Sequence, residues 1–190
     1  MIRLVGPGGA GKTTVGAALA ERLDVPFLDL DAVFTARHGD ISAYLALHGY
    51  DAYAQRNVSL YSDLAREPEP AVISLSSGFM TYRHSVHPDY VRGRQHIASS
   101  ESTFVLLPSL DLETCVAETV RRQLPRAFAR TAEREEHVIR SRFFTYARLP
   151  AGKVETMRPV DAVVAELLSI LVAGSCVHGA GDGRRRCCHR

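Results

Sequence analysis

The sequence reads Gly6-Pro7-Gly8-Gly9-Ala10-Gly11-Lys12-Thr13 directly after a short apolar segment at residues 2–5. The octapeptide fits the pattern G-x-x-x-x-G-K-[ST], whose glycines let the backbone curl until several N–H groups point at one phosphate. Residues 12–23 form an amphipathic helical pattern, and the N-terminus of that helix adds partial positive charge at the same place. The segment therefore predicts a strand, a phosphate-binding loop and a helix in succession.

Two side chains of this loop suit nucleotide chemistry. Lys12 can reach the β- and γ-phosphates, and the Thr13 hydroxyl can ligate Mg²⁺. Of the 23 Lys and Arg residues, only Lys12 and Lys153 are lysines. A planar guanidinium replaces a compact ammonium poorly at this position, so the rare lysine strengthens the interpretation. We expect ATP and Mg²⁺ as ligands, and we expect the loop to bind the nucleotide through Gly6, Gly8, Gly9, Ala10, Gly11, Lys12, Thr13 and Thr14.

Apolar segments alternate with helical patterns along the rest of the chain. Strands are predicted at residues 2–5, 26–29, 71–75, 103–107 and 153–156, and helices at 12–23, 41–47, 50–66, 90–98, 112–124, 133–146 and 159–173. Uncharged strands that alternate with helices are typical of a buried parallel sheet. We therefore predict an α/β protein with a P-loop kinase fold, a three-layer α/β/α sandwich around a mostly parallel five-stranded sheet. Its ligands should bind at the carboxyl ends of the strands.

Length and composition fit one globular domain. The chain has 190 residues, 46% of them hydrophobic, and a formal charge of +2. Residues 174–190 carry four arginines and one aspartate, or 4 − 1 = +3, which leaves 2 − 3 = −1 for the rest. We expect a kinase domain at residues 1–173 and a disordered basic tail at 174–190. No long apolar run, signal peptide or disulfide framework is evident, so we expect a cytoplasmic monomer with no membrane or nucleic-acid partner.

A second group of candidates is the acidic pair in Phe27-Leu28-Asp29-Leu30-Asp31. A GTPase or motor ATPase usually has a hydrophobic strand ending in Asp, but here residues 71–75 run into Ser76-Ser77-Gly78. Strand alternation puts Asp29 and Asp31 on the same side, near the γ-phosphate. One could hold Mg²⁺ through water and the other could accept a proton from an attacking hydroxyl. Alternatively, Asp31 only caps the next helix.

At this point the chain resembles the shikimate kinase family. The resemblance comprises the phosphate loop, Phe27-Leu28-Asp29-Leu30-Asp31, Gly39-Asp40-Ile41, Gly49 with Tyr53, Arg142 with Tyr146, Val154-Glu155-Thr156, and Arg158-Pro159. It covers residues 1–173, with a weaker match in the middle, and rests on the order and spacing of short motifs. It implies transfer of the ATP γ-phosphoryl group to a hydroxyl of a small anionic metabolite beneath a mobile lid.

The resemblance also implies roles for particular residues on the nucleotide side. Mg²⁺ would be served by Thr13 and Asp29, and the adenine ring would pack at Arg158 and Pro159. The lid would span about residues 120–133, where we favour Arg126 as the arginine over the γ-phosphate and take Arg122 next. Lys12, Asp31 and Arg126 form the predicted catalytic set.

On the acceptor side the match is incomplete. The resemblance implies that Asp31 holds or deprotonates the acceptor hydroxyl, that Arg142 pairs with its carboxylate, and that Ser77 and Gly78 lie under its ring. The family pattern Gly-Glu-x-x-Phe-Arg-x-x-Glu instead reads Gly49-Tyr50-Asp51-Ala52-Tyr53-Ala54-Gln55-Arg56-Asn57, and a Gly-Gly-Gly turn reads Ser76-Ser77-Gly78. The carboxylate-binding Arg has thus become alanine and the Glu has become asparagine. Arg56 lies about 200° around the helix and points elsewhere.

The retained phosphate loop and the altered acceptor region leave three functions open. The first is a small-molecule kinase whose acceptor, shikimate or another metabolite, the sequence does not identify. The second is a kinase for an antibiotic hydroxyl, a sugar acid or a nucleotide, of which chloramphenicol phosphotransferase is an example. The third is a nucleotide-binding regulator without catalysis, which the retention of both Asp29 and Asp31 argues against.

Overall fold

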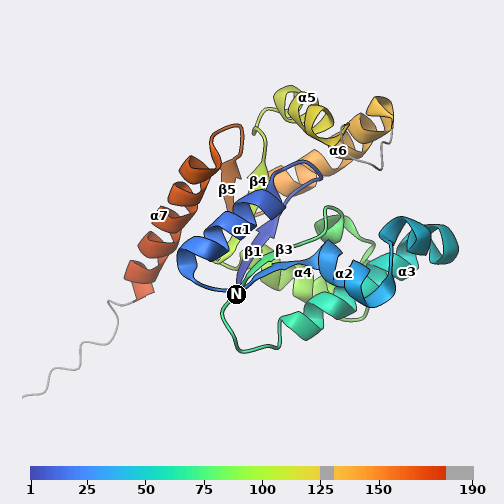
Figure 1. Ribbon diagram of the computed structural model, residues 1–190, viewed down its shortest axis with the longest axis horizontal. Helices are drawn as coiled ribbons and strands as arrows, with labels where there is room; N and C mark the ends of the chain where they lie inside the picture. The colour runs from blue at the N-terminus through green and yellow to red at the C-terminus, as the bar shows by residue number, and fades with distance from the viewer. Residues whose placement is uncertain (125–130, 179–190) are drawn as a thin grey trace, which may run out of the picture.

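The computed structural model describes residues 1–124 and 131–178. Its centre is a five-stranded sheet in the order β2-β3-β1-β4-β5, and every strand pair is parallel (Figure 1). The strands are β1 (Ile2–Val5), β2 (Phe27–Asp29), β3 (Val72–Ser74), β4 (Thr103–Leu107) and β5 (Gly152–Glu155). The central strand β1 pairs with β3 and β4, with Leu4 opposite Ser74 and Phe104. The predicted five-stranded α/β architecture is confirmed.

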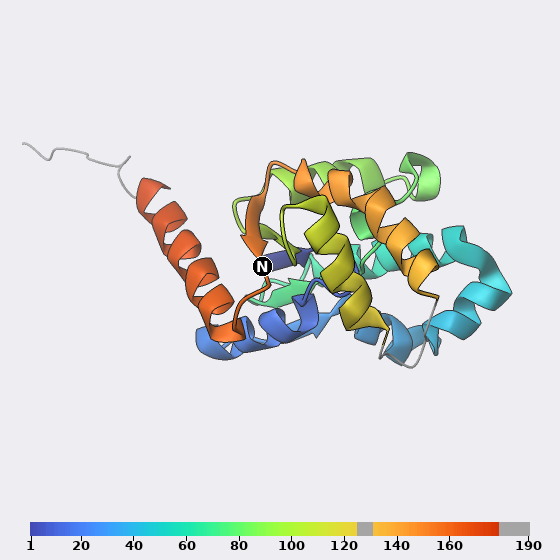
Figure 2. The ribbon, with the colours of Figure 1, turned by 90° about the horizontal axis from the view of Figure 1, so that it is seen from above.

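Seven α-helices and two short 3₁₀ turns complete the part of the chain that the structure describes. The α-helices are α1 (Lys12–Leu23), α2 (Leu30–His38), α3 (Ile41–Leu64), α4 (Tyr90–Ser99), α5 (Leu112–Gln123), α6 (Ala132–Ala147) and α7 (Val160–His178), and the 3₁₀ turns are η1 (Phe79–Thr81) and η2 (His84–Val86). Helices α1 and α7 contact each other on one face of the sheet, and α5 contacts α6 (Figure 2). No helix among these residues has the length and apolar character needed to span a membrane.

Two hydrophobic cores cover the two faces of the sheet. Alternate residues of a strand point to opposite faces, so Leu4 packs with α1 and α7, whereas the next residue, Val5, packs with the cluster to which α2, α3, α4, α5 and α6 contribute. Both side chains are almost completely buried. This is the predicted three-layer arrangement, and it places the loops that follow β1, β2 and β3 at one edge of the sheet.

The structure corrects several predicted boundaries. Helix α2 was not predicted, because Leu30 to His38 is short and follows β2 without a turn. The helices predicted at 41–47 and 50–66 are the two parts of α3, and the predicted break between them is confirmed by the non-helical backbone of Gly49 (φ 80°, ψ 170°). Helix α7 continues to His178, so residues 174–178 belong to a helix and not to the predicted disordered tail. Residues 179–190 lie outside the described residues.

Candidate active site

The phosphate loop lies between β1 and α1, at the carboxyl edge of the sheet. Gly6, Gly9 and Gly11 all have positive φ angles, of 152°, 70° and 87°. At Gly6 a Cβ atom would also collide with the carbonyl oxygen of Leu106 on β4. Gly6 is therefore required both by its backbone conformation and by its contact with the sheet, and the loop is fixed next to the central strands.

Lys12 is the first residue of α1 and is buried. Its Nζ donates hydrogen bonds of 2.8 Å to the carbonyl oxygens of Gly6 and Pro7. These bonds stabilise the buried ammonium charge, which would be costly to bury without hydrogen-bond partners. They also hold the ammonium group against the loop. The predicted phosphate-binding lysine thus lies on the loop that it is expected to serve.

Thr13 and Asp29 meet across the start of α1 and the end of β2. The Thr13 hydroxyl donates a 2.7 Å hydrogen bond to Asp29 Oδ2. Asp29 Oδ1 accepts the N–H groups of Asp31 and Ala32 at 3.0 and 3.3 Å, so Asp29 is the N-cap of α2. The interpretation that Asp31 caps this helix is wrong.

A hydroxyl and a carboxylate oxygen held together beside a phosphate loop fit Mg²⁺, which prefers oxygen ligands. Within residues 1–124 and 131–178 there is no group of three or more His, Cys, Asp or Glu side chains placed to bind a metal. This agrees with the chemistry of Mg²⁺, because it is commonly held by one or two protein groups together with substrate phosphates and water. Thr13 and Asp29 therefore suit the predicted metal role.

Asp31 is held by a network of neutral polar groups. Its Oδ1 accepts a 3.1 Å hydrogen bond from the Tyr53 hydroxyl and a short one from the Ser76 hydroxyl. Behind them, Asn57 Nδ2 lies 3.0 Å from the Tyr53 oxygen, 2.7 Å from the Ser76 oxygen and 2.9 Å from the Tyr82 oxygen. Asn57 is completely buried. The network orients the carboxylate and leaves Oδ2 without a hydrogen bond to the described residues.

The tyrosines of this network remain protonated at neutral pH. Burial raises the pKa of Tyr53 above its ordinary value, and the negative charge of Asp31 raises it further. Burial also raises the pKa of Tyr82. A neutral phenol donates a hydrogen bond to a carboxylate, so the Tyr53 hydroxyl remains the donor and Asp31 the acceptor over the physiological pH range.

The acceptor side contains Arg142, Ser77 and Gly78 close together, in agreement with the predicted grouping. Arg142 on α6 donates to the Ser77 hydroxyl at 3.4 Å and to the Tyr50 hydroxyl at 3.3 Å. The Tyr146 hydroxyl donates a 2.8 Å bond to the Ser77 carbonyl oxygen and so anchors the turn. A Cβ on Gly78 would collide with the Tyr50 hydroxyl, so glycine permits this close approach.

One cavity is lined by residues from both the predicted nucleotide region and the predicted acceptor region. It has a volume of about 320 Å³, and its lining includes Gly8 of the phosphate loop, Asp31, Ser77 and Arg142. The predicted groups that bind phosphate, hydroxyl and carboxylate thus face one space that is large enough for a small metabolite.

The lid arginine favoured from the sequence, Arg126, lies outside the described residues. The second candidate, Arg122 on α5, donates to the Gly9 carbonyl oxygen at 3.2 Å and to the Thr156 hydroxyl and carbonyl oxygens at 3.1 and 3.0 Å. Its Nε donates to Glu118 at 2.6 Å. Because Arg121 and Arg122 both bind this carboxylate, the pKa of Glu118 falls to about 2. Arg122 is thereby positioned directly beside the phosphate loop.

The arginine predicted to pack against adenine is held by the end of the sheet. Arg158 donates to the Glu155 carbonyl oxygen at 3.2 and 3.3 Å and forms an ion pair with Glu166 of α7. Its hydrogen bonds with the described residues therefore hold it to β5 and α7. Pro159 directly precedes α7.

The sequence did not single out Tyr53, Asn57, Ser76 and Tyr82 as partners of Asp31. A partial signal was present, because Tyr53 and Asn57 are four residues apart on α3 and so share one helix face. The link to Ser76 and Tyr82 depends on how α3 packs against the segment after β3, which local periodicity does not reveal.

A phosphate loop between β1 and α1, a parallel sheet of order 2-3-1-4-5 and an acidic pair facing the loop define a protein with the P-loop kinase fold. The sequence profile of the shikimate kinase family matches residues 8–171 of this chain. The chain therefore belongs to the shikimate kinase family.

Individual relatives agree with this assignment. A shikimate kinase of Nitratidesulfovibrio vulgaris is 29% identical over 174 residues, which cover 88% of this chain and 93% of the relative. A shikimate kinase of Haemophilus influenzae strain PittEE is 35% identical over 103 residues, or 54% of this chain, and the chain spans only 56% of that relative's length.

Solved structures share the fold. The shikimate kinase from Acinetobacter baumannii in complex with shikimate has a TM-score of 0.70 at 22% identity, with 91% of this chain and 93% of that chain covered. A gluconokinase from Sinorhizobium meliloti 1021 has a TM-score of 0.62 at 18% identity, with coverages of 95% and 97%. At these identities the likeness concerns the fold.

Proposed function

We propose that this chain is an ATP-dependent phosphotransferase that moves the γ-phosphoryl group to a hydroxyl of a small metabolite bearing a carboxylate. The observation that carries the proposal is the single cavity lined by Gly8, Asp31 and Arg142. A nucleotide-binding loop, a carboxylate base and a carboxylate-binding guanidinium are what such a two-substrate reaction requires. Membership of the shikimate kinase family supports the same reaction class.

Each group has a defined part in the proposed reaction. The loop amides and Lys12 would hold the β- and γ-phosphates, and Thr13 and Asp29 would hold Mg²⁺, which when bound neutralises charge on those phosphates. Asp31 Oδ2 would accept the proton of the acceptor hydroxyl while the hydroxyl oxygen forms a bond to the γ-phosphorus and ADP leaves. Arg142 would bind the acceptor carboxylate through two N–H groups.

We further propose that the acceptor differs from shikimate. Ala54 and Asn57 stand where the family pattern has a carboxylate-binding Arg and a Glu, and both side chains are buried, with relative exposures of 1% and 0%. Loss of one buried bidentate contact weakens binding by about 2–4 kcal/mol, or roughly 30- to 1000-fold. Such a loss supports an acceptor that contacts Arg142 through a carboxylate and presents a neutral, hydroxyl-rich part to the wall in front of Asn57.

The test is ADP release by the purified chain across a panel of hydroxylated carboxylates. Shikimate and gluconate both belong to the panel, the latter because a gluconokinase shares the fold, and antibiotics with a free hydroxyl and nucleosides extend it to acceptors without a carboxylate. We expect Asp31→Asn to lower turnover at least 100-fold and to spare ATP binding, which calorimetry measures. Asp63→Asn is the matched control, since Asp63 is an exposed carboxylate paired with Arg66.

Two outcomes would contradict parts of the proposal. Tight ATP binding with no ADP formed on any acceptor would favour a non-catalytic regulator. Turnover of shikimate at metabolic rates would refute the changed acceptor and leave the kinase reaction intact.

A further inference from the structure

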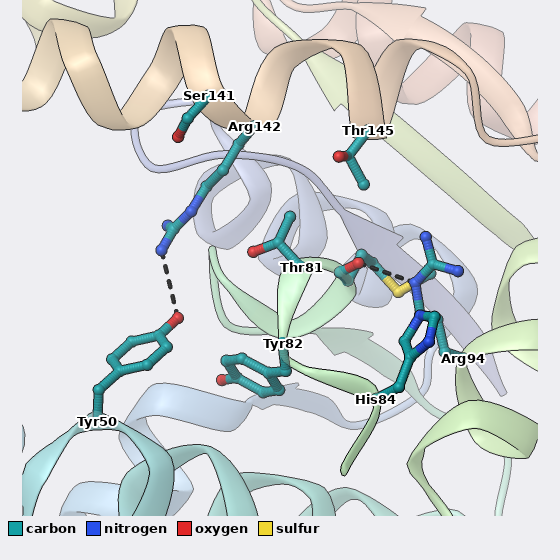
Figure 3. A pocket seen from close by; sticks show the side chains of 9 residues that line it. Tyr50, Thr81, Tyr82, His84, Arg94, Ser141, Arg142 and Thr145 are labelled. Carbon is teal, nitrogen blue, oxygen red and sulfur yellow. Dashed lines mark hydrogen bonds between the residues drawn. The ribbon is translucent and has the colours of Figure 1, made fainter. Parts of the chain in front are cut away.

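A second cavity lies under α6 and shares Arg142 with the cavity already described. It has a volume of about 470 Å³. Figure 3 shows Ser141, Arg142 and Thr145 projecting from α6 on one side, and Thr81 and Tyr82 on the other. Arg142 and Tyr50 lie at one end, and Arg94 and His84 lie at the opposite end (Figure 3). We refer to this cavity as the α6 groove.

The α6 groove is lined by basic and neutral side chains. Of the nine lining residues, Arg94, Arg142 and His84 are basic, and the other six are Tyr, Met, Thr or Ser. No acidic side chain is among them. A concave surface lined by one sign of charge focuses the electrostatic field and attracts ligands of the opposite sign. The groove therefore suits an anion.

Arg94 is held in position to bind an anion. Its Nε donates a 2.9 Å hydrogen bond to the Met80 carbonyl oxygen, and its side chain lies near the Tyr90 hydroxyl. It forms no ion pair with any carboxylate of the part of the chain that the structure describes. By contrast Arg92, two residues earlier on α4, is 85% exposed and pairs with Asp89 at 2.9 Å. A guanidinium anchored through Nε still offers its terminal N–H groups to a carboxylate or phosphate.

Arg142 connects the two cavities. It lines both of them, and its Nη2 contacts the Tyr50 hydroxyl at only 3.3 Å. A carboxylate is a stronger partner for a guanidinium than a phenol is. A ligand carboxylate that replaces the Tyr50 hydroxyl would therefore lie between Asp31 on one side and the α6 groove on the other.

We infer that the phosphoryl acceptor carries a second anionic group, which Arg94 binds at the far end of the α6 groove. The acceptor is then an elongated hydroxy acid with two anionic groups. Its reactive hydroxyl faces Asp31, its first carboxylate contacts Arg142, and its second carboxylate or phosphate contacts Arg94. This inference rests on the proposed function, because it assigns the groove to the acceptor.

Binding of three related probes tests the inference. Gluconate has one anionic group, glucarate has a second carboxylate, and 6-phosphogluconate has a phosphate at the same end. We expect glucarate or 6-phosphogluconate to bind the full chain about 10-fold more tightly than gluconate by calorimetry, since a hydrogen-bonded charge of a half-buried arginine contributes about this factor. Whichever of glucarate and 6-phosphogluconate binds more tightly identifies the second anionic group as a carboxylate or a phosphate.

Variants on α4 locate the preference. Arg94→Gln should remove most of the 10-fold advantage and leave gluconate binding unchanged, and Arg92→Gln should change neither. Arg94→Lys keeps the charge and loses the planar guanidinium, so it should retain part of the 10-fold tighter binding. This variant replaces Arg94→Gln in the test if Arg94→Gln does not fold. Equal affinities for all three probes, no binding of any of them, or a full preference in Arg94→Gln would overturn the inference.

ADP release in the same samples separates the two proposals. An Arg94-dependent preference without ADP formation from these probes or from any acceptor of the panel would refute the proposed kinase function and the assignment of the groove to an acceptor. Turnover of gluconate as efficient as that of glucarate and 6-phosphogluconate would refute the second anionic group alone.

Discussion

Tyr53→Phe is the most direct probe of the network that holds Asp31. The substitution removes the hydroxyl that donates to Asp31 Oδ1 at 3.1 Å and lies 3.0 Å from Asn57 Nδ2, and it keeps the ring that packs against Phe34. Ser76 then remains as the one described donor to that oxygen. Phenylalanine is also the residue of the family pattern at this position, so the variant restores the residue of that pattern.

The expected size of the effect follows from the bonds lost. A hydrogen bond to a charged group contributes about 1.5–3 kcal/mol, and the lower value applies because Asp31 is only partly buried. We expect kcat for the best acceptor to fall about 10-fold. Loss of the buried hydroxyl should also lower the free energy of unfolding by about 1–2 kcal/mol, or the Tm by roughly 2–8 °C.

Steady-state ADP release and thermal unfolding measure both effects. The KM for ATP should not change, because Tyr53 has no hydrogen bond with the phosphate loop. Tyr44→Phe is the matched control, since the Tyr44 ring also packs against Phe34 and its hydroxyl makes no hydrogen bond with the described residues. A kcat within twofold of wild type, with ATP binding intact, would show that the Tyr53 hydroxyl does not orient the base and would refute this reasoning.

Three further perturbations test other parts of the site and fold. Gly78→Ala places a Cβ against the Tyr50 hydroxyl. The KM for the acceptor should therefore rise about 10-fold while the KM for ATP stays unchanged. An equal rise in both KM values would contradict a local effect. Arg122→Gln removes the bond to the Gly9 carbonyl oxygen and should weaken MgATP binding about 10-fold by calorimetry, whereas unaltered affinity would separate Arg122 from the nucleotide site. Burial raises the pKa of Tyr90 to about 12, above its unfolded value of about 10, so its contribution to stability is complete below pH 10 and is lost as pH rises towards 12. The loss of unfolding free energy between pH 10 and pH 12, measured in urea, should therefore be about 2 kcal/mol smaller in Tyr90→Phe than in the wild type.

The sequence predicted the parts of the fold that depend on local pattern. The phosphate loop could be located because its glycines and Lys12 have fixed spacing, and β4 because Thr103–Leu107 is an uninterrupted β-prone run. Helix α2 was missed because Asp29 ends β2 and caps α2 at once, so no turn separates the two elements. Helix α7 was predicted too short, since residues 174–190 were assigned to a disordered basic tail.

The candidate site was predictable only in part for a different reason. Thr13 and Asp29 could be paired because the family motifs fix both positions. The surroundings of Asp31 could not, because Ser76 is 45 residues away and reaches it only through the packing of α3 against the turn after β3. Arg122 shows the same limit, since its contact with Gly9 spans 113 residues.

The two altered positions on α3 are physically coupled. Residues 54 and 57 are three apart on a helix and therefore neighbours, and in the family pattern they hold an Arg and a Glu. Because residue 57 is fully buried, a Glu there beside Ala54 would be an unpaired buried charge, which costs about 3–5 kcal/mol. Asn57 avoids that cost and supplies an amide to Tyr53, Ser76 and Tyr82. The absence of the arginine and the neutral network around Asp31 are thus one change, which removes charge from the buried wall near Asp31 and, in the proposed function, leaves Arg142 to bind the acceptor carboxylate.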